Sequence, residues 1–196
     1  MPGIIAARAY ATRLRARLSS NVSQLPNMGF HIRRAVEDDA PALVELRRRL
    51  FAETSFMLWE PAEFTNTADD ERKRIARLQG RANSVVLVAE AASQPVGLLT
   101  AVGGEVNRLR HSATLALGVA KSHWGRGIAT ALVWEAVAWS ATAAVARLEL
   151  TVHTSNLAAI AVYLRCGFEV EGRRRRSLFV DGAYVDEYLM SRLAAG

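Results

Sequence analysis

The sequence lacks residues that several large classes of protein require. Among 196 residues it contains one cysteine, Cys166, so it holds neither an internal disulfide framework nor a zinc site built from clustered cysteines. No uninterrupted apolar run reaches about 18 residues, which excludes a membrane-spanning helix. The four histidines are scattered without metal-ligand spacing, and we therefore expect no metal. Apolar residues make up 51% of the chain, which is enough to bury a sizeable core.

The charge is unevenly distributed along the chain. The formal net charge is +6, but six arginines and no acidic residue lie within residues 1–36, and the rest of the chain carries as many acidic as basic residues. A formally neutral body argues against a nucleic-acid or membrane partner for the folded part. We therefore divide the chain into a basic N-terminal extension, residues 1–28, and a folded domain, residues 29–193.

Residues 1–28 admit three interpretations. The segment is rich in arginine, contains no acidic residue and ends in a stretch with Ser, Asn and Pro that leads to Gly29, which is typical of a transit peptide. A tail that touches a membrane or nucleic acid is the second interpretation. The third is an upstream start codon taken for the true one, because Met28 stands directly before the first strand-like run.

The remaining sequence predicts one mixed α/β domain. Apolar alternation and helical periodicity give the order β-α-α-β-β-β-α-β-α-β-β. Asp38 or Asp39 is expected to cap the first helix, with Pro41 in its first turn, and Thr67 with Asp70 forms a capping-box pattern. The expected strands are 30–35, 84–89, 96–102, 112–119, 147–152, 168–175 and 184–190, and the expected helices follow residue 39 and cover 68–79, 125–142 and 156–166.

The most informative stretch joins the strand that ends at Val119 to the apolar helix after it. Gly125 and Gly127 open this helix, and glycines let backbone N–H groups approach a ligand without a Cβ in the way. The helix N-terminus adds free donors and a partial positive charge, which suits a diphosphate. A P-loop is excluded because Gly-Lys-Ser/Thr is absent, and a dinucleotide fingerprint lacks its third glycine, at Thr130. A helix start with two glycines and no ligand is the alternative.

These residues resemble the GNAT superfamily of acyl-CoA-dependent N-acyltransferases. The family's loop pattern is Q/R-x-x-G-x-G/A, and residues 124–129 fit it except that Trp124 replaces Gln or Arg. The segment 171–184 is similar to the branch of ribosomal-protein, spermidine and amino-acid acetyltransferases. A second family block is matched by Leu150, Val152, Asn156, Ala159, Tyr163, Gly167 and Phe168.

The resemblance implies a central mixed, mostly antiparallel sheet with flanking helices (an α+β arrangement), and acetyl-CoA as cosubstrate without a metal. An amine would attack the thioester directly. Backbone groups of Leu117, Gly118 and Val119 would hold the pantetheine arm, and one N–H would polarise the thioester carbonyl. Asn156 would anchor the arm or the start of its own helix. The diphosphate would lie against Gly125, Arg126, Gly127, Ile128, Ala129 and Thr130.

Tyr163 and Glu149 are the candidate catalytic residues. The resemblance implies that Tyr163 assists the departing thiolate, and a hydrogen bond is favoured over full proton transfer because a phenol has a pKa of about 10 and a thiol about 8.5. The family often has a glutamate where this chain has Thr151. Glu149, two residues earlier on the same strand face, is therefore the candidate base, acting through a water. The alternatives are a packed aromatic for Tyr163 and a solvent-facing residue for Glu149.

The acceptor is expected to be a small-molecule or peptide amine. At pH 7 an α-amine with a pKa of about 7.8 is neutral roughly once in seven molecules, and a lysine-like amine of about 10.4 roughly once in 2,500. Because Glu149 is a weak candidate for the base, an acceptor that is already partly neutral is favoured. Amino acids and peptide N-termini are therefore favoured over polyamines. Phe56, Trp59 and Phe64 either line an acceptor pocket or pack in the core.

Two other functions stay open at this point. One is a non-catalytic acyl-CoA sensor, because the family's glutamate is missing at Thr151. The other is a nucleic-acid-binding protein that uses the basic tail and the arginines at 173–176. A solvated hairpin edge is the favoured interpretation of those arginines, and a contact with a phosphate or an acidic substrate is the alternative. We expect a cytoplasmic protein with no membrane partner, and the sequence leaves the oligomeric state open, a homodimer included.

Overall fold

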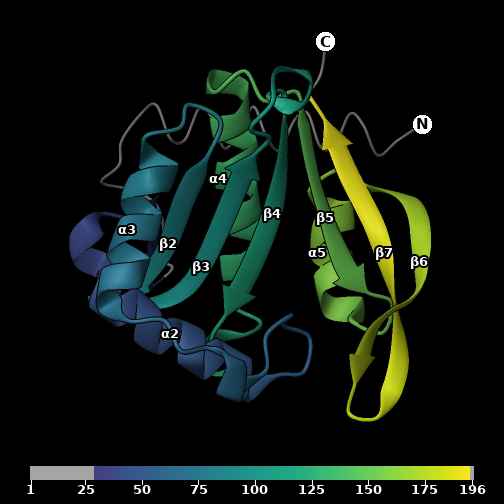
Figure 1. Ribbon diagram of the computed structural model, residues 1–196, viewed down its shortest axis with the longest axis horizontal. Coiled ribbons are helices and arrows are strands. Elements are labelled where there is room, and N and C mark those ends of the chain that lie inside the picture. The colour runs from purple at the N-terminus through teal and green to yellow at the C-terminus, as the bar shows by residue number, and fades with distance from the viewer. Residues whose placement is uncertain (1–28, 195–196) are drawn as a thin grey trace.

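The computed structural model describes residues 29–194, so the predicted extension over 1–28 lies outside the described residues. These residues form a seven-stranded sheet in the order β1-β2-β3-β4-β5-β7-β6 (Figure 1). All neighbouring strands are antiparallel except β4 and β5. The predicted mixed, mostly antiparallel sheet with flanking helices is confirmed. The strands are β1 (His31–Arg34), β2 (Val85–Ala91), β3 (Gln94–Gly103), β4 (Ser112–Val119), β5 (Arg147–His153), β6 (Glu169–Val180) and β7 (Ala183–Leu193), and the α-helices are α2 (Ala40–Glu53), α3 (Ala68–Gln79), α4 (Ile128–Thr142) and α5 (Leu157–Arg165).

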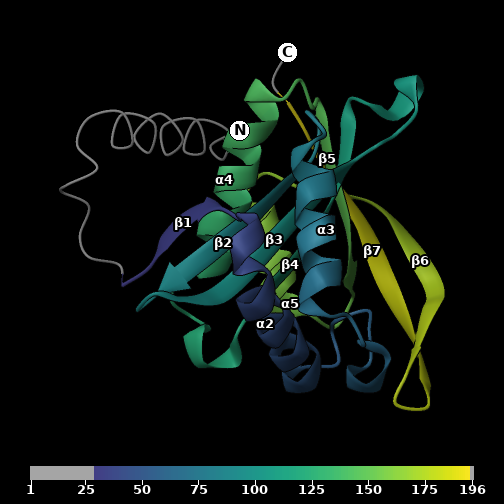
Figure 2. The same ribbon diagram turned by 60° about the vertical axis from the view of Figure 1, so that its left-hand side comes forward.

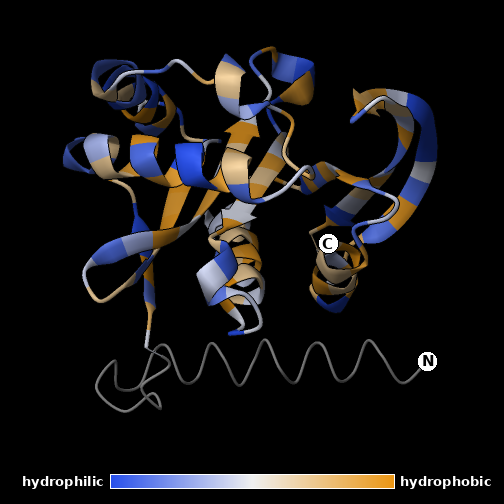
Figure 3. Cartoon of the chain, turned by 90° about the horizontal axis from the view of Figure 1, so that it is seen from below, coloured by the Kyte–Doolittle hydropathy of each residue, from blue (hydrophilic) through white to orange (hydrophobic). Residues whose placement is uncertain are grey.

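Helices cover both faces of the sheet, with α4 and α5 on one face and α2 and α3 on the other (Figures 1 and 2). Successive residues of β2 alternate between two cores. Leu87 belongs to the core under α4, whereas Val86 and Val88 belong to the core under α2 and α3. A strand that is buried on both faces must be apolar at every position, which explains the run 85–89 and the hydrophobic middle strands in Figure 3.

Local sequence signals set several element boundaries as predicted. Asp70 N–H donates to the Thr67 hydroxyl at 3.2 Å and Thr67 N–H donates to the Asp70 carboxylate at 2.9 Å, which completes the capping box of α3. Asn156 Oδ1 accepts the backbone N–H three residues on, at 3.1 Å, at the start of α5. The β6–β7 hairpin turns at Asp181 and Gly182, which have φ values of 50° and 80°.

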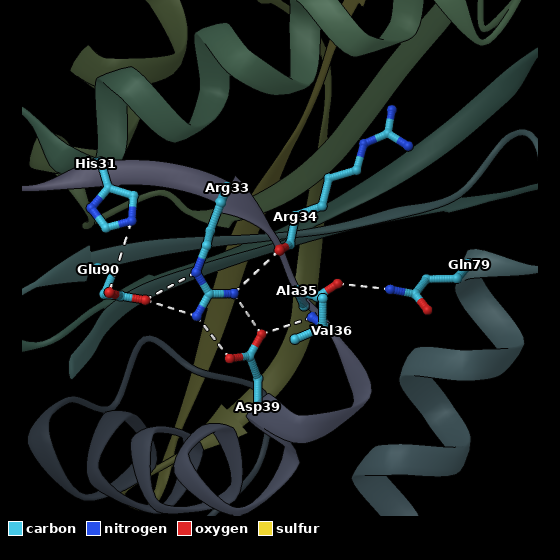
Figure 4. Close-up of polar contacts among 8 residues, drawn as sticks. All are labelled: His31, Arg33, Arg34, Ala35, Val36, Asp39, Gln79 and Glu90. Carbon is cyan, nitrogen blue, oxygen red and sulfur yellow. Dashed lines mark hydrogen bonds and ion pairs between the residues drawn. The ribbon is translucent and has the colours of Figure 1, made fainter. Parts of the chain in front are cut away.

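The cap predicted at Asp38 or Asp39 is different in the structure. Asp39 does precede α2, with Pro41 in the first turn, but its side chain makes no capping bond to that helix. The Asp39 carboxylate instead accepts two 2.7 Å hydrogen bonds from Arg33 on β1 (Figure 4). Arg33 also donates to Glu90 on β2, at 2.9 and 2.7 Å. A bidentate charged pair is stronger than a cap, and here it ties the chain before α2 to the sheet.

Helix α4 begins at Ile128, three residues later than the sequence predicted. Gly125 and Gly127 have φ values of 74° and 80°, in the left-handed region, where a right-handed helix cannot continue. The two glycines therefore form a turn ahead of the helix, with Gly127 as the N-cap residue.

The arginines at 173–176 do not follow the regular alternation of a strand. Strand β6 bulges after Arg174 relative to β7, and Arg176 has a φ of 51°. A bulge breaks the two-residue period of a strand. Arg173 is bound to Asp186 at 2.6 Å and Arg174 to Glu187 at 3.3 Å, both across the hairpin.

Candidate active site

The sheet opens where β4 and β5 separate. The two strands pair only from Ser112 opposite Arg147 to Thr114 opposite Glu149. Beyond that pair each strand runs on without pairing to the other, β4 to Val119 and β5 to His153, and Figure 1 shows them diverging. The inner edge of β4 is thus left with unpaired backbone groups, which an extended ligand can use as if it were another strand.

Leu117 and Val119 turn their backbone groups toward this gap. The Ala120 N–H donates to the Val96 carbonyl at 2.9 Å, in register with the β3–β4 ladder, so the even-numbered residues of β4 bond to β3. The N–H and C=O groups of the odd-numbered residues therefore point the other way. The Val119 carbonyl is already in use, because it accepts the indole N–H of Trp124 at 2.6 Å.

The backbone groups of Gly118 do not face the gap, although they were predicted to hold the pantetheine arm. Its own backbone groups pair with β3, so two of the three residues predicted to hold the pantetheine arm face the gap. A Cβ at Gly118 would come within 2.7 Å of the Leu50 Cδ1 of α2. The Leu50 side chain of α2 thus packs in the space that a Cβ at this position would fill.

Six consecutive backbone N–H groups are free at the start of α4. In the described part of the chain, the N–H groups of residues 125–130 donate to no acceptor, and the next one, of Ala131, donates to the Gly127 carbonyl at 3.0 Å. Left-handed residues in a turn are typical of anion-binding nests, and the helix N-terminus adds its positive end. The buried side chain of Ile128 fixes the helix to the core, and the exposed Arg126 adds a positive charge. This stretch suits a diphosphate.

Asn156 and Tyr163 lie at the two ends of α5. The Asn156 side chain caps the helix, which is one of the two roles predicted for it. Tyr163 is 7% exposed and packs in the core under α4, with its ring 5.8 Å from that of Phe168. Burial raises the pKa of the Tyr163 hydroxyl well above its ordinary value. A harder-to-ionise phenol is a poorer proton donor but still a good hydrogen-bond donor.

The two candidate catalytic residues are on opposite faces of the sheet. Leu150 on β5 belongs to the core that holds Tyr163. Because strand residues alternate, Glu149, Thr151 and His153 share the other face of β5, on the side of α2 and α3. Tyr163 is therefore on the α4 side of the sheet and Glu149 on the α2–α3 side.

The Glu149 carboxylate is part of an ion-pair network. Arg147 Nε donates to it at 2.7 Å, and Arg147 Nη1 donates to Glu171 on β6 at 2.8 Å. Ser191 on β7 adds a 2.6 Å bond to Glu171. The bonds from Arg147 and Ser191 lower the pKa of Glu171 to about 2. Glu149 is thus held by a guanidinium at the point where the strands part.

His153 is the residue of this region that the sequence reasoning missed. It is 5% exposed, and its Nε2 atom is buried without a hydrogen-bond partner among the described residues. The ring of Phe56 packs edge-on against it, with centroids 5.5 Å apart at 88°. The two-residue period of β5, which places 149, 151 and 153 on one face, is the signal that points to it.

The three aromatic residues left undecided by the sequence take different roles. Phe64 packs against Phe51 of α2, with ring centroids 5.0 Å apart. Phe56 covers His153, and Trp59 is half-exposed. Phe56 is therefore the member of the set that borders the candidate site.

Other chemically reactive groups are sparse. Among residues 29–194, no three His, Cys, Asp or Glu side chains are grouped so as to hold a metal ion. No helix in this range has the length and apolar character needed to cross a membrane. The Cys166 thiol is free and buried, and burial raises its pKa to about 11.

Comparison with known proteins gives a consistent result. A family model described as "Acetyltransferase (GNAT) family" matches residues 42–168. The chain is 36% identical over 118 residues to the L-amino acid N-acetyltransferase AaaT of Escherichia coli, covering 60% of this chain and 73% of that protein. It is 31% identical over 101 residues to spermidine N(1)-acetyltransferase of Vibrio cholerae, covering 51% of this chain and 57% of that protein.

Solved structures agree with the sequence comparisons. The crystal structure of a GNAT-family acetyltransferase from Streptococcus pneumoniae superposes with a TM-score of 0.82 at 29% identity. The match covers 84% of this chain and 99% of the other. The fold is therefore shared over nearly all of the described residues.

Proposed function

The chain belongs to the acetyltransferase (GNAT) family, and on that premise we propose that it moves the acetyl group of acetyl-CoA to a primary amine by direct attack. The amine belongs to an amino acid, another small molecule or a peptide N-terminus. The observation that carries the proposal is the row of free N–H groups at 125–130 beside the gap between β4 and β5.

The two open features of the site suit the two parts of the cosubstrate. The diphosphate binds the N–H groups of residues 125–130, with Arg126 adding charge. The pantetheine arm runs along the open edge of β4, where Leu117 offers an N–H and a C=O and Val119 an N–H. The thioester then lies in the gap, and an N–H of β4 polarises its carbonyl as negative charge develops on the oxygen.

The acceptor approaches from the α2–α3 face of the sheet. Tyr163, on the opposite face, donates a hydrogen bond to the thiolate as it leaves. Its raised pKa favours this role over full proton transfer. Glu149 is the carboxylate nearest the point where the strands part, and the sequence indicates it as the base. One of its carboxylate oxygens is already bound by Arg147 Nε, at 2.7 Å.

An α-amino acceptor is the finer part of this proposal. The proton of an α-ammonium is lost about 400 times more readily than that of a lysine-like ammonium. The similarity to AaaT, named as an L-amino acid N-acetyltransferase, supports the same class. The similarity to spermidine N(1)-acetyltransferase covers less of the chain at lower identity.

A non-catalytic acyl-CoA sensor is the second candidate function. The observation that favours it is the engaged state of Glu149, together with Thr151 in the place of the family's glutamate. The nucleic-acid alternative loses support, since Arg173 and Arg174 are both engaged in ion pairs within the hairpin.

Binding and turnover separate these functions. Calorimetry with coenzyme A tests the site, and thiol release from acetyl-CoA with a panel of amino acids, dipeptides and polyamines tests catalysis. An enzyme binds coenzyme A and releases thiol with at least one amine. A sensor binds but releases none, and an absence of coenzyme A binding contradicts both.

A further inference from the structure

We propose that His153 is the group that takes the proton from the acceptor amine, and that the amine enters the site beside Glu187. The inference deepens the proposed acetyltransferase function and rests on it. It assigns to His153 the step for which Glu149 was the candidate from sequence.

The first observation is that His153 is buried with an unused nitrogen. The residue is 5% exposed, and Nε2 finds no partner among the described residues. A buried polar atom without a partner is costly, and each such atom in a native fold calls for an explanation. A ligand that hydrogen-bonds to Nε2 supplies one.

The second observation is the position of His153 along β5, relative to the residues of β4 across the gap. The last paired residues are Thr114 and Glu149, so four residues further on His153 is at the level of Gly118. Gly118 lies between the two residues, 117 and 119, whose N–H groups face the gap. His153 thus lies on the acceptor face, across the gap from the backbone donors that we assign to the thioester.

The third observation is the charge around His153. Glu187 on β7 is its direct neighbour, in a pair without mutual backbone bonds, because Thr154 N–H donates to Asp186 O in the next pair. Side chains in such pairs approach closely. Glu187 is buried and accepts from Arg174 of β6 at 3.3 Å. A buried carboxylate paired with His153 on the same strand face attracts an ammonium that enters the site.

The other charges on the elements that border this face are engaged: Glu53, at the end of α2, pairs with Arg49 and accepts the Lys121 N–H at 2.6 Å. Glu149 and Arg147 are four and six residues earlier on β5, on the same face and bound to each other. From the segment after α2, the contact is the uncharged ring of Phe56. The Phe56 ring packs against the imidazole and Nε2 is buried, so an acceptor that reaches this atom must displace side chains such as Phe56. An acceptor with an apolar group beside its amine can replace the Phe56 ring in this apolar contact.

An imidazole also matches the chemistry better than a carboxylate. Proton transfer from an α-ammonium, with a pKa of about 7.8, to an imidazole of about 6.5 is unfavourable by roughly 20-fold. Transfer to an ordinary carboxylate of about 4.3 is unfavourable by roughly 3,000-fold. A base closer in pKa to the amine leaves a larger share of it ready to attack.

The step balances as follows. The ammonium R–NH3+ gives one proton to Nε2, and the nitrogen lone pair forms a bond to the carbonyl carbon of acetyl-CoA. The C–S bond breaks, and its electron pair leaves on the sulfur. The second proton of the nitrogen goes to that thiolate. The products are R–NH–COCH3, CoA–SH and an imidazolium, which returns its proton to water.

The test compares the wild-type protein with His153→Gln, which keeps a polar side chain but cannot take up a proton. We expect kcat/KM for the best amine of the panel to fall at least 100-fold, while the Kd for coenzyme A changes less than threefold. The acid limb of the pH profile of kcat/KM, where the base becomes protonated, is expected to disappear. His111→Gln is the matched control, because His111 is exposed at the far end of β4.

Three outcomes overturn the inference. One is wild-type turnover and an unchanged pH profile in His153→Gln. Another is a fall in kcat/KM of at least 100-fold in Glu149→Gln while kcat/KM of His153→Gln stays at the wild-type value. That result would assign the proton-accepting role to Glu149. If His153→Gln does not fold, the wild-type complex with coenzyme A is titrated with the amine, and the imidazole 15N shifts are read by NMR. A His153 signal that stays unchanged also overturns it. If the wild type releases no thiol with any amine, the proposed function itself fails.

Discussion

The indole Nε1 of Trp124 donates a 2.6 Å hydrogen bond to the carbonyl of Val119, the last residue of β4. Trp124 stands where the family pattern has Gln or Arg, and it is 49% exposed. The bond ties the loop with the free N–H groups to the open strand edge. The two halves of the proposed cosubstrate site are therefore held together by one side chain.

Coenzyme A is expected to change the intrinsic fluorescence of the protein through Trp124, because the indole is bound to the strand end along which we propose that the pantetheine arm runs. Trp124→Phe should abolish that change and alter the Kd for coenzyme A less than fivefold, since main-chain groups provide most of the binding. Fluorescence titration and calorimetry measure the two quantities. Trp59→Phe is the control that keeps the change, and a Trp124→Phe variant that keeps it as well would contradict the assignment.

Gly127→Ala should weaken the binding of coenzyme A at least tenfold. A Cβ there meets no atom within 4 Å, so the effect comes from the φ of 80°, which costs a non-glycine residue roughly 1–2 kcal/mol. The loop relaxes and its N–H groups no longer converge. Gly172→Ala adds the same atom in open space without a left-handed φ, and its Kd should stay unchanged. Equal Kd values for both variants would count against the amide site.

Tyr163→Phe should lower kcat about 10- to 100-fold, the value of a hydrogen bond to a charged group. The Kd for coenzyme A and the melting temperature should hardly move, because the hydroxyl has no hydrogen bond within residues 29–194 that the change would remove. Steady-state thiol release and a thermal melt measure these effects. An unchanged kcat would remove Tyr163 from the mechanism.

Cys166 should resist thiol reagents in the folded protein. Its pKa is raised to about 11, so at pH 8 it holds about a hundred-fold less thiolate than an ordinary thiol of pKa 9. Because burial favours the neutral thiol, Cys166 contributes to the free energy of unfolding. This contribution is complete below pH 9 and is lost as the pH rises through 11. Labelling with a chromogenic disulfide at pH 8, with and without denaturant, measures the accessibility. Rapid labelling of the folded protein would be inconsistent with this burial.

The sequence predicted those parts of the fold that depend on interactions between residues close to each other in the chain. The capping box of Thr67 and Asp70 and the turn at Asp181 and Gly182 depend on neighbours within a few residues. The position of Asp39 before α2 was likewise predictable. Its bonds to Arg33 were not, because they arise when β1 and the start of α2 meet.

The candidate site divides in the same way. Gly125 and Gly127 indicate the loop in the sequence. Their left-handed conformations keep residues 125–127 out of the helix, and these conformations could not be predicted from the apolar pattern. The predicted helix therefore started too early. The bond from Arg147 to Glu149 and the contact of Phe56 with His153 depend on how segments meet in three dimensions. Residues 56 and 153 are far apart in the sequence, and no local pattern links them.

A crystal structure of the complex with coenzyme A is the decisive experiment for the cosubstrate site. We expect diphosphate oxygens within about 3.2 Å of backbone nitrogens in residues 125–130, and the sulfur in the gap between β4 and β5 near the Tyr163 hydroxyl. A complex with the diphosphate bound away from this loop, or with the sulfur outside the gap, would contradict the proposed site.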